Sequence, residues 1–245
     1  MTAERVQGAP PADPGSNEAL ARKYDAVGYV GRSNPLSHPD ALATAATLHG
    51  LLPPAIPSCR VLDVGCGDGA NLLPMAAALP DARFVGCDLS PRAISAAREA
   101  VAQLGLGNVT LVEGDLRKLS DALGSFDYIL AHGLYSWVPA EVRDALLDLA
   151  ARRLSPNGLV FVSYNVYPGC HVRQAAWETL RFHGERFGGT RARLEAARAL
   201  AAALAEPARA QDETDALLRR EFARIAAEPD GALYHDDLGV PNDPL

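Results

Sequence analysis

Cysteine and long apolar runs are both scarce in this sequence of 245 residues. Its four cysteines, at positions 59, 66, 87 and 170, lack the spacing of metal ligands, so we expect reduced thiols and no metal site. No apolar run reaches the roughly 18 residues of a membrane span, and residues 1–17 lack the hydrophobic core of a signal peptide. These absences predict a cytoplasmic, soluble protein without a membrane partner.

Positive charge is also in short supply. The sequence has 23 Lys and Arg against 30 Asp and Glu, which gives a formal net charge of -7. No cluster of Lys and Arg is free of nearby acids, so a phosphate backbone would meet no overall positive field. We therefore expect no nucleic-acid partner. The 48% hydrophobic fraction is ample for a core, and the length fits one elaborated α/β domain or two small domains.

The N-terminal part divides into two segments. Residues 1–17 are rich in Pro, Gly and Ala without periodicity, which predicts disorder. Residues 18–58 are expected to form a lid and a helix. The helix begins at Pro39 and has Leu42, Ala45, Leu48 and Leu51 on one face.

Apolar runs and amphipathic helices alternate from residue 60 onward. We expect strands at 60–64, 83–87, 109–112, 126–131 and 159–164, and helices at 70–79, 91–104 and 139–153. This order predicts an α/β fold, a doubly wound and mostly parallel sheet covered on both faces. Ser90 and Gly105 bound the second helix, and LSPNG at 154–158 is typical of a turn.

The strand pattern stops after Asn165. Residues 171–230 predict three helices, with a break at Glu206 and Pro207. We therefore divide the chain into a binding domain at 59–170 and a helical cap and tail at 171–245.

The segment VLDVGCGDGANL, residues 61–72, contains the strongest functional signal. Asp63 ends a strand, and Gly65, Gly67 and Gly69 then bring the backbone close to a ligand at the strand tips. The spacing G-x-G-x-G differs from the G-x-G-x-x-G that seats a pyrophosphate. Because Asp63 would repel a pyrophosphate and attract a cationic amino group, an amino-acid-bearing nucleoside fits better than a dinucleotide.

Two further acids follow neighbouring strands. Asp88 directly follows the second strand, where a carboxylate can accept both ribose hydroxyls of NAD or of S-adenosylmethionine. Asp115 follows the third strand and could receive an adenine amine, with Leu89 and Leu116 near the ring faces. Three acids at three successive strand tips indicate one ligand that spans them.

With these motifs the sequence resembles the class I S-adenosylmethionine-dependent methyltransferases. The resemblance rests on VLDVGCGDG, FVGCDLSPRAI, VEGDLRKL, FDYILAHGLYSWV and LSPNGLVFVSYN, and covers about residues 38–170. It implies a Rossmann-like sheet with S-adenosyl-L-methionine across the strand ends. The implied cofactor contacts are Asp63, Gly65, Cys66, Gly67, Gly69, Asn71, Asp88, Leu89, Asp115, Leu116 and His132.

A narrower resemblance extends over most of the chain. YDAVGYVGRSNPLSHPDALATAATLHGL, GLYSWVP and SYNVYPGCH look like bacterial methyltransferases that carry a methyltransferase regulatory domain, some of which methylate protein lysines. A full class I domain has two further strands, for which LGVPNDPL offers no match. Three explanations for the two missing strands stay open. The sequence is a fragment of a longer family member, it is a short form of the domain, or it forms a homodimer in which another subunit completes the sheet edge.

Methyl transfer from a sulfonium needs orientation and exclusion of water rather than a protein nucleophile. Asn165, with Tyr167 nearby, could aim the lone pair of an amine acceptor. Tyr135 could face the sulfonium through cation–π attraction, and His132 is either a general base or a hydrogen-bonded supporting residue.

A lid over the cofactor is expected before the sheet. Its candidate residues are Tyr24, Tyr29 and His38, in a segment whose glycines permit hinge motion. The alternative is an ordinary surface strap.

The leading hypothesis is therefore N-methylation of an amine on a small molecule or a protein. A cyclase that converts S-adenosylmethionine to azetidine-2-carboxylate and methylthioadenosine is one alternative. A non-catalytic cofactor-binding module is another, and a nicotinamide dehydrogenase is more distant.

Overall fold

A five-stranded parallel sheet forms the centre of the computed structural model, which describes residues 27–29, 31–206, 212–239 and 242–245. The strands are β1 (Arg60–Val64), β2 (Arg83–Asp88), β3 (Val109–Glu113), β4 (Phe126–Ala131) and β5 (Leu154–Val162). Their order is β3-β2-β1-β4-β5, and every neighbouring pair is parallel. The order reverses at β1 and β4, which opens a crevice at the carboxyl ends of these strands. The predicted Rossmann-like, doubly wound fold is confirmed.

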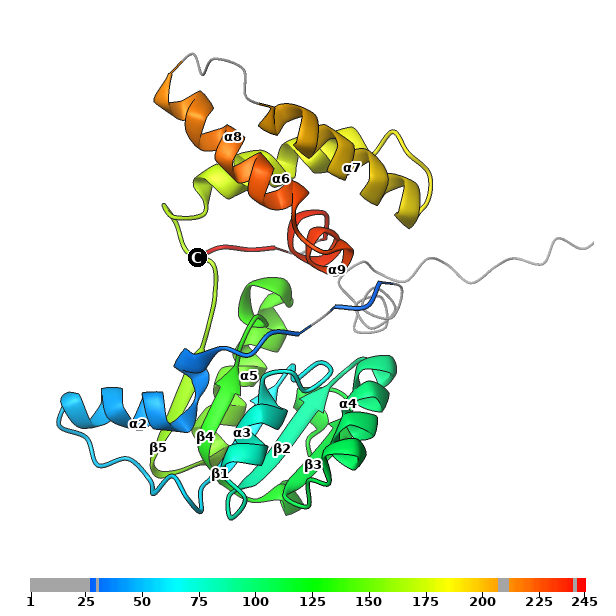
Figure 1. Ribbon diagram of the computed structural model, residues 1–245. Helices are drawn as coiled ribbons and strands as arrows, with labels where there is room; N and C mark the ends of the chain where they lie inside the picture. Colours follow the sequence, from blue (N-terminus) through cyan, green and yellow to red (C-terminus); the bar gives the residue numbers. More distant parts are fainter. Residues whose placement is uncertain (1–26, 30, 207–211, 240–241) are drawn as a thin grey trace, which may run out of the picture.

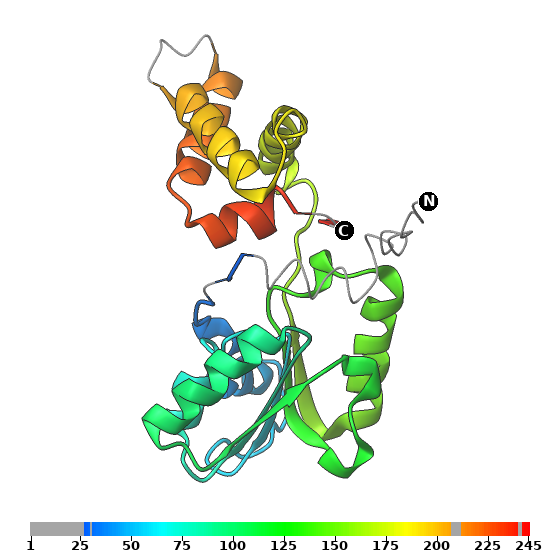
Figure 2. The ribbon, with the colours of Figure 1, turned by 90° about the vertical axis from the view of Figure 1, so that its right-hand side faces the viewer.

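Helices cover both faces of this sheet (Figures 1 and 2). They are α2 (Pro39–Leu48), α3 (Leu72–Ala78), α4 (Pro91–Leu104) and α5 (Ala140–Arg153). Short 3₁₀ turns are η1 (Pro35–Ser37), η2 (Leu116–Lys118), η3 (Asp121–Leu123) and η4 (Tyr135–Trp137). None of the helices among the described residues is long and apolar enough to cross a membrane.

Successive residues of the central strands pack into two different cores. Val61 and Tyr128 pack with α3 and the buried Ala43 of α2, whereas Leu62 and Ile129 pack with α5. This alternation follows from the two-residue period of a strand. Because both faces are covered, the strand tips are the polar, open edge of the sheet.

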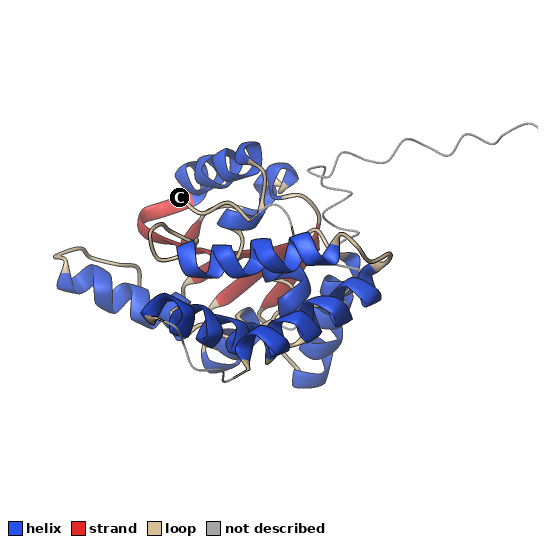
Figure 3. Cartoon of the chain, turned by 90° about the horizontal axis from the view of Figure 1, so that it is seen from above, coloured by secondary structure: helices blue, strands red, loops and turns tan. Residues whose placement is uncertain are grey.

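A layer of helices lies beyond the strand tips (Figures 1 and 3). It comprises α6 (His171–Gly184), α7 (Thr190–Ala205), α8 (Glu213–Ala226), α9 (Asp230–Ala232) and the π-helical turn η5 (Leu233–Asp237). Leu180, Ala197, Ile225 and Leu233 are fully buried in its separate apolar core. We call this layer the cap.

Residues 27–29 and 31–38, which we call the strap, run between the cap and the sheet (Figure 2). Val27 packs against the core of the cap, and its carbonyl oxygen lies 2.6 Å from His235 Nε2. At the other end of the strap, His38 caps α2 by accepting the Asp40 N–H at 3.1 Å. The strap therefore connects the two layers. The disorder predicted for residues 1–17 lies outside the described part of the chain.

Local signals predicted some elements well and others poorly. Ser90 Oγ caps α4 by accepting the Ala93 N–H, and Gly105 ends it at φ 65°. The expected apolar face of α2 is wrong, since Leu48 is 82% exposed and Ala43 and Ala46 are buried instead. The turn expected at 154–158 is a bulge inside β5, with Asn157 at φ 61° between the pairings of Leu154 and Leu159.

Candidate active site

A cavity of about 810 Å³ lies between the strand tips and the cap. Its walls come from the loops after β1, β2, β3, β4 and β5, from the strap, and from Asp236 of the cap. Twelve of the residues predicted for the site line it: Tyr29, Asp63, Gly65, Cys66, Gly67, Asn71, Asp88, Leu89, Asp115, Leu116, His132 and Asn165. The fold therefore gathers most of the predicted site around one space.

The glycine loop after β1 turns sharply beneath this cavity. Gly65 and Gly67 have φ of 76° and 55°, in the left-handed region that glycine adopts without strain. Both line the cavity. Gly69, at φ 81°, does not, and a Cβ there would lie 2.9 Å from Leu73 Cγ. Gly69 is thus a turn and packing residue.

Asp63 is a buried carboxylate at the tip of β1. It is 2% exposed, and its Oδ2 has no hydrogen-bond partner among the residues that the structure describes. Burial raises its pKa to about 7, which the nearby Asn71 side chain partly opposes and Asp88 reinforces. A ligand cation could satisfy this oxygen, because a buried unpaired acceptor costs about 1–3 kcal/mol.

Asp88 is held in place at the tip of β2 by two backbone donors. Its Oδ2 accepts the Gly67 N–H and its Oδ1 accepts the Ser90 N–H, each at 2.9 Å. Asp88 also lines the cavity. The same contacts fix the position of the glycine loop relative to β2.

Asp115 also lines the cavity, but its carboxylate already has a charged partner. Arg117 Nη2 lies 2.7 Å from Asp115 Oδ2, and the Arg117 N–H donates to Oδ1 at 2.9 Å. An adenine amine at this point would have to share the carboxylate with Arg117.

Hydrogen bonds to His132 determine which of its tautomers is present. Asn34 Oδ1 accepts the Leu36 N–H, so the NH₂ end of this amide faces His132 Nδ1 at 3.3 Å. Nδ1 must therefore accept, and the neutral ring carries its proton on Nε2. Ser163 Oγ, which accepts the Gly133 N–H, lies 2.9 Å from the same nitrogen. Burial lowers the pKa of His132. This arrangement favours a supporting role over that of a general base.

The strap is bound to the glycine loop as well as to His132. Asn71 Oδ1 accepts the Asn34 N–H at 2.9 Å and the Ser37 hydroxyl at 3.2 Å. Asp68 Oδ2 accepts the Gly31 N–H at 3.4 Å. The strap thus covers the same strand tips that bear the glycine loop.

Several predicted residues lie outside the cavity wall. Tyr135 contacts Tyr164 and Arg143, and His38 caps α2. The Tyr167 hydroxyl donates to Gln174 Oε1 at 2.8 Å, and its ring stacks on His171. Asn165 lines the cavity, although its amide donates to Asn242 Oδ1 at 3.1 Å. Tyr24 falls outside the residues whose structure is described.

The structure adds residues that the sequence analysis missed. Asp236, Ser163 and Asn34 lie in the cavity wall or hold it in place. Two consecutive acids in LYHDDL, at the end of the helical region, are the sequence feature that could have indicated Asp236 as a site residue. Cys66, in contrast, is no nucleophile, because burial raises the pKa of its thiol far above the ordinary range.

Comparison with known proteins identifies the family of this chain. Residues 61–158 match a family model described as a methyltransferase domain. The structure of PKMT2 from Rickettsia typhi in complex with AdoHcy superposes with a TM-score of 0.79 and 34% identity, covering 88% of this chain. The chain is a class I S-adenosylmethionine-dependent methyltransferase. The predicted enzyme class and the cofactor, S-adenosyl-L-methionine, are confirmed, and the methyltransferase is similar to protein-lysine methyltransferases.

Two proteins of Rickettsia prowazekii, uncharacterized proteins RP789 and RP028, are also similar to this methyltransferase. Each is 34% identical over 220 residues, which is 89% of this chain. The chain spans 40% of RP789 and 42% of PKMT2, but 88% of RP028. The fold thus occurs in relatives of very different length. The comparisons lend no support to the cyclase or to the non-catalytic module.

Proposed function

We propose that this methyltransferase transfers the methyl group of S-adenosylmethionine to an amine nitrogen on a small molecule or a protein. The observation that carries the proposal is the charge of the cavity. Among the described residues of its wall, the carboxylates are Asp63, Asp68, Asp88, Asp115 and Asp236, and the cations are Arg32 and Arg92. An excess of carboxylates favours a sulfonium cofactor and an acceptor that arrives as an ammonium ion.

The cofactor supplies an electrophilic methyl group, and the strand-tip residues hold it in orientation. Asp63 would accept from the methionine amino group, which satisfies its otherwise unpartnered buried oxygen. Gly65, Cys66, Gly67 and Asn71 would surround this end, and Gly69 would shape the turn of the loop. Asp88 would accept the ribose hydroxyls. Asp115, Leu89, Leu116 and His132 would contact the adenosyl portion.

The acceptor nitrogen forms a bond to the methyl carbon as the S–C bond breaks and its electron pair stays on sulfur. The amine must lose one proton for this step, and water can take it. We propose that Asn165 accepts from the acceptor N–H. Tyr29 and His38 would belong to the lid over the cofactor.

The remaining features of the proposal concern organisation and partners. Of the residues that the structure describes, those within 18–58 would form the lid and helix, those within 59–170 the cofactor domain, and those within 171–245 the cap and tail. The partner is the amine substrate, with no nucleic acid or membrane. A homodimer and a cytoplasmic location stay predictions.

Incubation with S-adenosylmethionine tests this function, first alone and then with lysine, polylysine or alkylamines. S-adenosylhomocysteine that forms only with an amine, together with a methylated amine seen by mass spectrometry, is the expected result. Methylthioadenosine without an acceptor would indicate the cyclase. Binding without turnover across the panel would indicate the non-catalytic module.

Calorimetry tests the cofactor contacts separately. Asp88→Ala should weaken S-adenosylhomocysteine binding at least tenfold, because it removes the acceptor for two hydroxyls. Unchanged affinity would overturn the ribose assignment.

A further inference from the structure

The carboxylates of the cavity wall occupy two sides. Asp63, Asp88 and Asp115 belong to the strand tips, and Asp68 is bound to the Gly31 and Ala70 N–H groups. Asp236 alone among them comes from the cap, in the turn η5. It faces the cavity from the side opposite the strand tips, where the proposed function has no cofactor contact. We therefore expect Asp236 to contact the second substrate, the methyl acceptor, rather than the cofactor.

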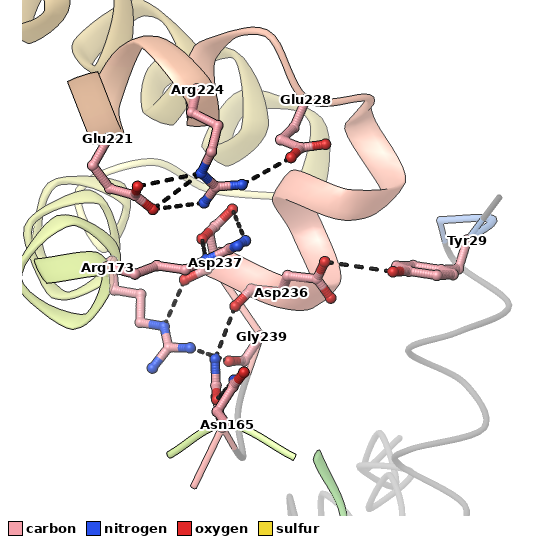
Figure 4. Close-up of polar contacts among 11 residues, drawn as sticks. Tyr29, Asn165, Arg173, Glu221, Arg224, Glu228, Asp236, Asp237 and Gly239 are labelled. Atoms are coloured by element: carbon pink, nitrogen blue, oxygen red, sulfur yellow. Dashed lines mark hydrogen bonds and ion pairs between the residues drawn. The ribbon is translucent and has the colours of Figure 1, made fainter. Parts of the chain in front are cut away.

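Asp236 is held beside Tyr29 of the strap, as Figure 4 shows. The Tyr29 hydroxyl donates to Asp236 Oδ2 at 3.5 Å. The Tyr29 ring meets His235 edge-on at 5.7 Å, and Gly231 lies so close to Gly28 that a Cβ there would overlap the Gly28 carbonyl oxygen. Strap and turn are thus packed tightly together. The phenol and the carboxylate form one polar pair at the cavity wall.

Two arginines of the cap near this pair, Arg173 and Arg224, have other partners (Figure 4). Arg173 pairs with Asp237 at 3.0 Å, Arg224 pairs with Glu221 and Glu228, and Arg32 pairs with Glu228. Within the described ranges, no lysine or arginine forms an ion pair with Asp236. Burial raises the pKa of Asp236 to about 6, with Asp237 and Glu228 adding to the shift and Arg173 opposing it. A cationic ligand group would stabilise its ionised form.

We propose that Asp236, supported by Tyr29, binds the acceptor amine on the cap side of the cavity. This inference rests on the proposed amine methylation. The carboxylate accepts a hydrogen bond from the arriving ammonium group, and the phenol fixes the orientation of the carboxylate. Trp137 and Tyr164, which also line the cavity, provide aromatic wall for an aliphatic stem. The amine is then held between the cap and the cofactor side.

A pair of adenosyl ligands tests this without knowledge of the natural acceptor. In both, a nitrogen replaces the sulfur of S-adenosylmethionine. In place of the methyl group, one carries a 3-aminopropyl arm and the other a butyl arm of the same length. Calorimetry on the wild type should show at least tenfold tighter binding of the ammonium arm. In Asp236→Asn this preference should fall below about twofold, and in Tyr29→Phe it should fall to an intermediate value.

The matched control is Asp148→Asn, an exposed acid on α5 far from the cavity wall, which should keep the full preference. S-adenosylhomocysteine should bind the wild type, Asp236→Asn and Asp148→Asn within about threefold. Normal S-adenosylhomocysteine binding by a wild type without ammonium preference would overturn the inference alone. An undiminished preference in Asp236→Asn would do the same. Failure of the wild type to bind S-adenosylhomocysteine would overturn the proposed function, and this inference with it.

Discussion

Two buried carboxylates, one on the strand-tip side of the cavity and one in the cap, differ in the partners that the protein gives them. Asp63, at the strand tips, is 2% exposed and has an Oδ2 without a partner among the described residues. Asp237, in the cap, is fully buried but receives the Nε and Nη2 of Arg173 at 3.0 and 3.3 Å. Desolvation raises the pKa of both. Of these two buried acids, only Asp237 receives an opposing charge from the protein itself.

The presence or absence of a cationic partner distinguishes a structural ion pair from a ligand-binding acid. An uncompensated buried acid destabilises the ligand-free fold and gains most when a cation arrives. A buried acid that is paired with an arginine instead holds two elements of the fold together. Arg173 of α6 reaches η5 through Asp237, and Arg181 of α6 donates to the Asp237 carbonyl oxygen at 2.9 Å. The comparison thus predicts that the strand-tip acid controls affinity and that the cap pair controls stability.

The largest effect is expected for Asp63→Asn. S-adenosylhomocysteine affinity should fall about 100- to 1000-fold, because the ammonium group loses its charged partner in a buried site. The ligand-free variant should nevertheless be more stable than the wild type at pH 8. The folded pKa of Asp63, about 7, lies above the ordinary 3.8, so wild-type stability falls as pH rises between these values. The gain should be roughly 4 kcal/mol at pH 8 and absent below pH 4.

Calorimetry and thermal unfolding at pH 5 and pH 8 measure these two quantities. Asp81→Asn, an exposed acid, is the control for a change of net charge. Equal affinity in Asp63→Asn, or a lower melting temperature at pH 8, would contradict the contrast between the two sides.

The second prediction compares the two members of the cap pair. Arg173→Met should lower the free energy of unfolding by about 2–3 kcal/mol, because it leaves the fully buried Asp237 unpaired. Asp237→Asn should cost less, since the Arg173 side chain is 29% exposed and can turn to water. Urea titration measures both. S-adenosylhomocysteine affinity should stay within threefold, and a large loss would show that the two sides are not separable.

The third prediction concerns the strap, which lies between the two sides. Asn34→Ala removes the amide donor that faces His132 Nδ1 and opposes protonation there. The His132 pKa should therefore rise toward its ordinary 6.5, as NMR titration would show. S-adenosylhomocysteine affinity should fall about three- to tenfold through a looser strap. An unchanged His132 titration would mean that burial alone sets its pKa.

The strand-tip side could be predicted from sequence because its residues follow strands directly. Asp63 is the second-last residue of β1 and Asp88 is the last residue of β2. Parallel strands bring such ends to one edge whatever the details of packing. Ser90 and Gly105 marked α4 in the same local way. These signals depend on chain neighbours only.

The cap side depended on contacts between distant segments. Tyr29 and Asp236 are 207 positions apart, and only the packing of the strap on η5 brings them together. Tyr167 was expected near the acceptor from its distance along the chain. Its side chain instead turns to Gln174 of α6. This contact could be predicted only if the orientation of α6 were known. The sequence pattern alone does not determine the direction in which such a side chain points.

The smallest effect is expected at Asp115, a strand-tip acid that resembles Asp237 of the cap in having an arginine partner among the described residues. Asp115 is bound by Arg117, whose side chain is 38% exposed. Arg117→Ala should free the carboxylate for the adenine amine and tighten S-adenosylhomocysteine binding by up to about threefold, since an exposed ion pair contributes little. Lys118→Ala removes a neighbouring charge without touching this pair and serves as the control. Weaker binding in Arg117→Ala would indicate that the arginine orients Asp115 for the ligand. Asp115 would then be a binding acid that, unlike Asp63, depends on an arginine of the protein itself.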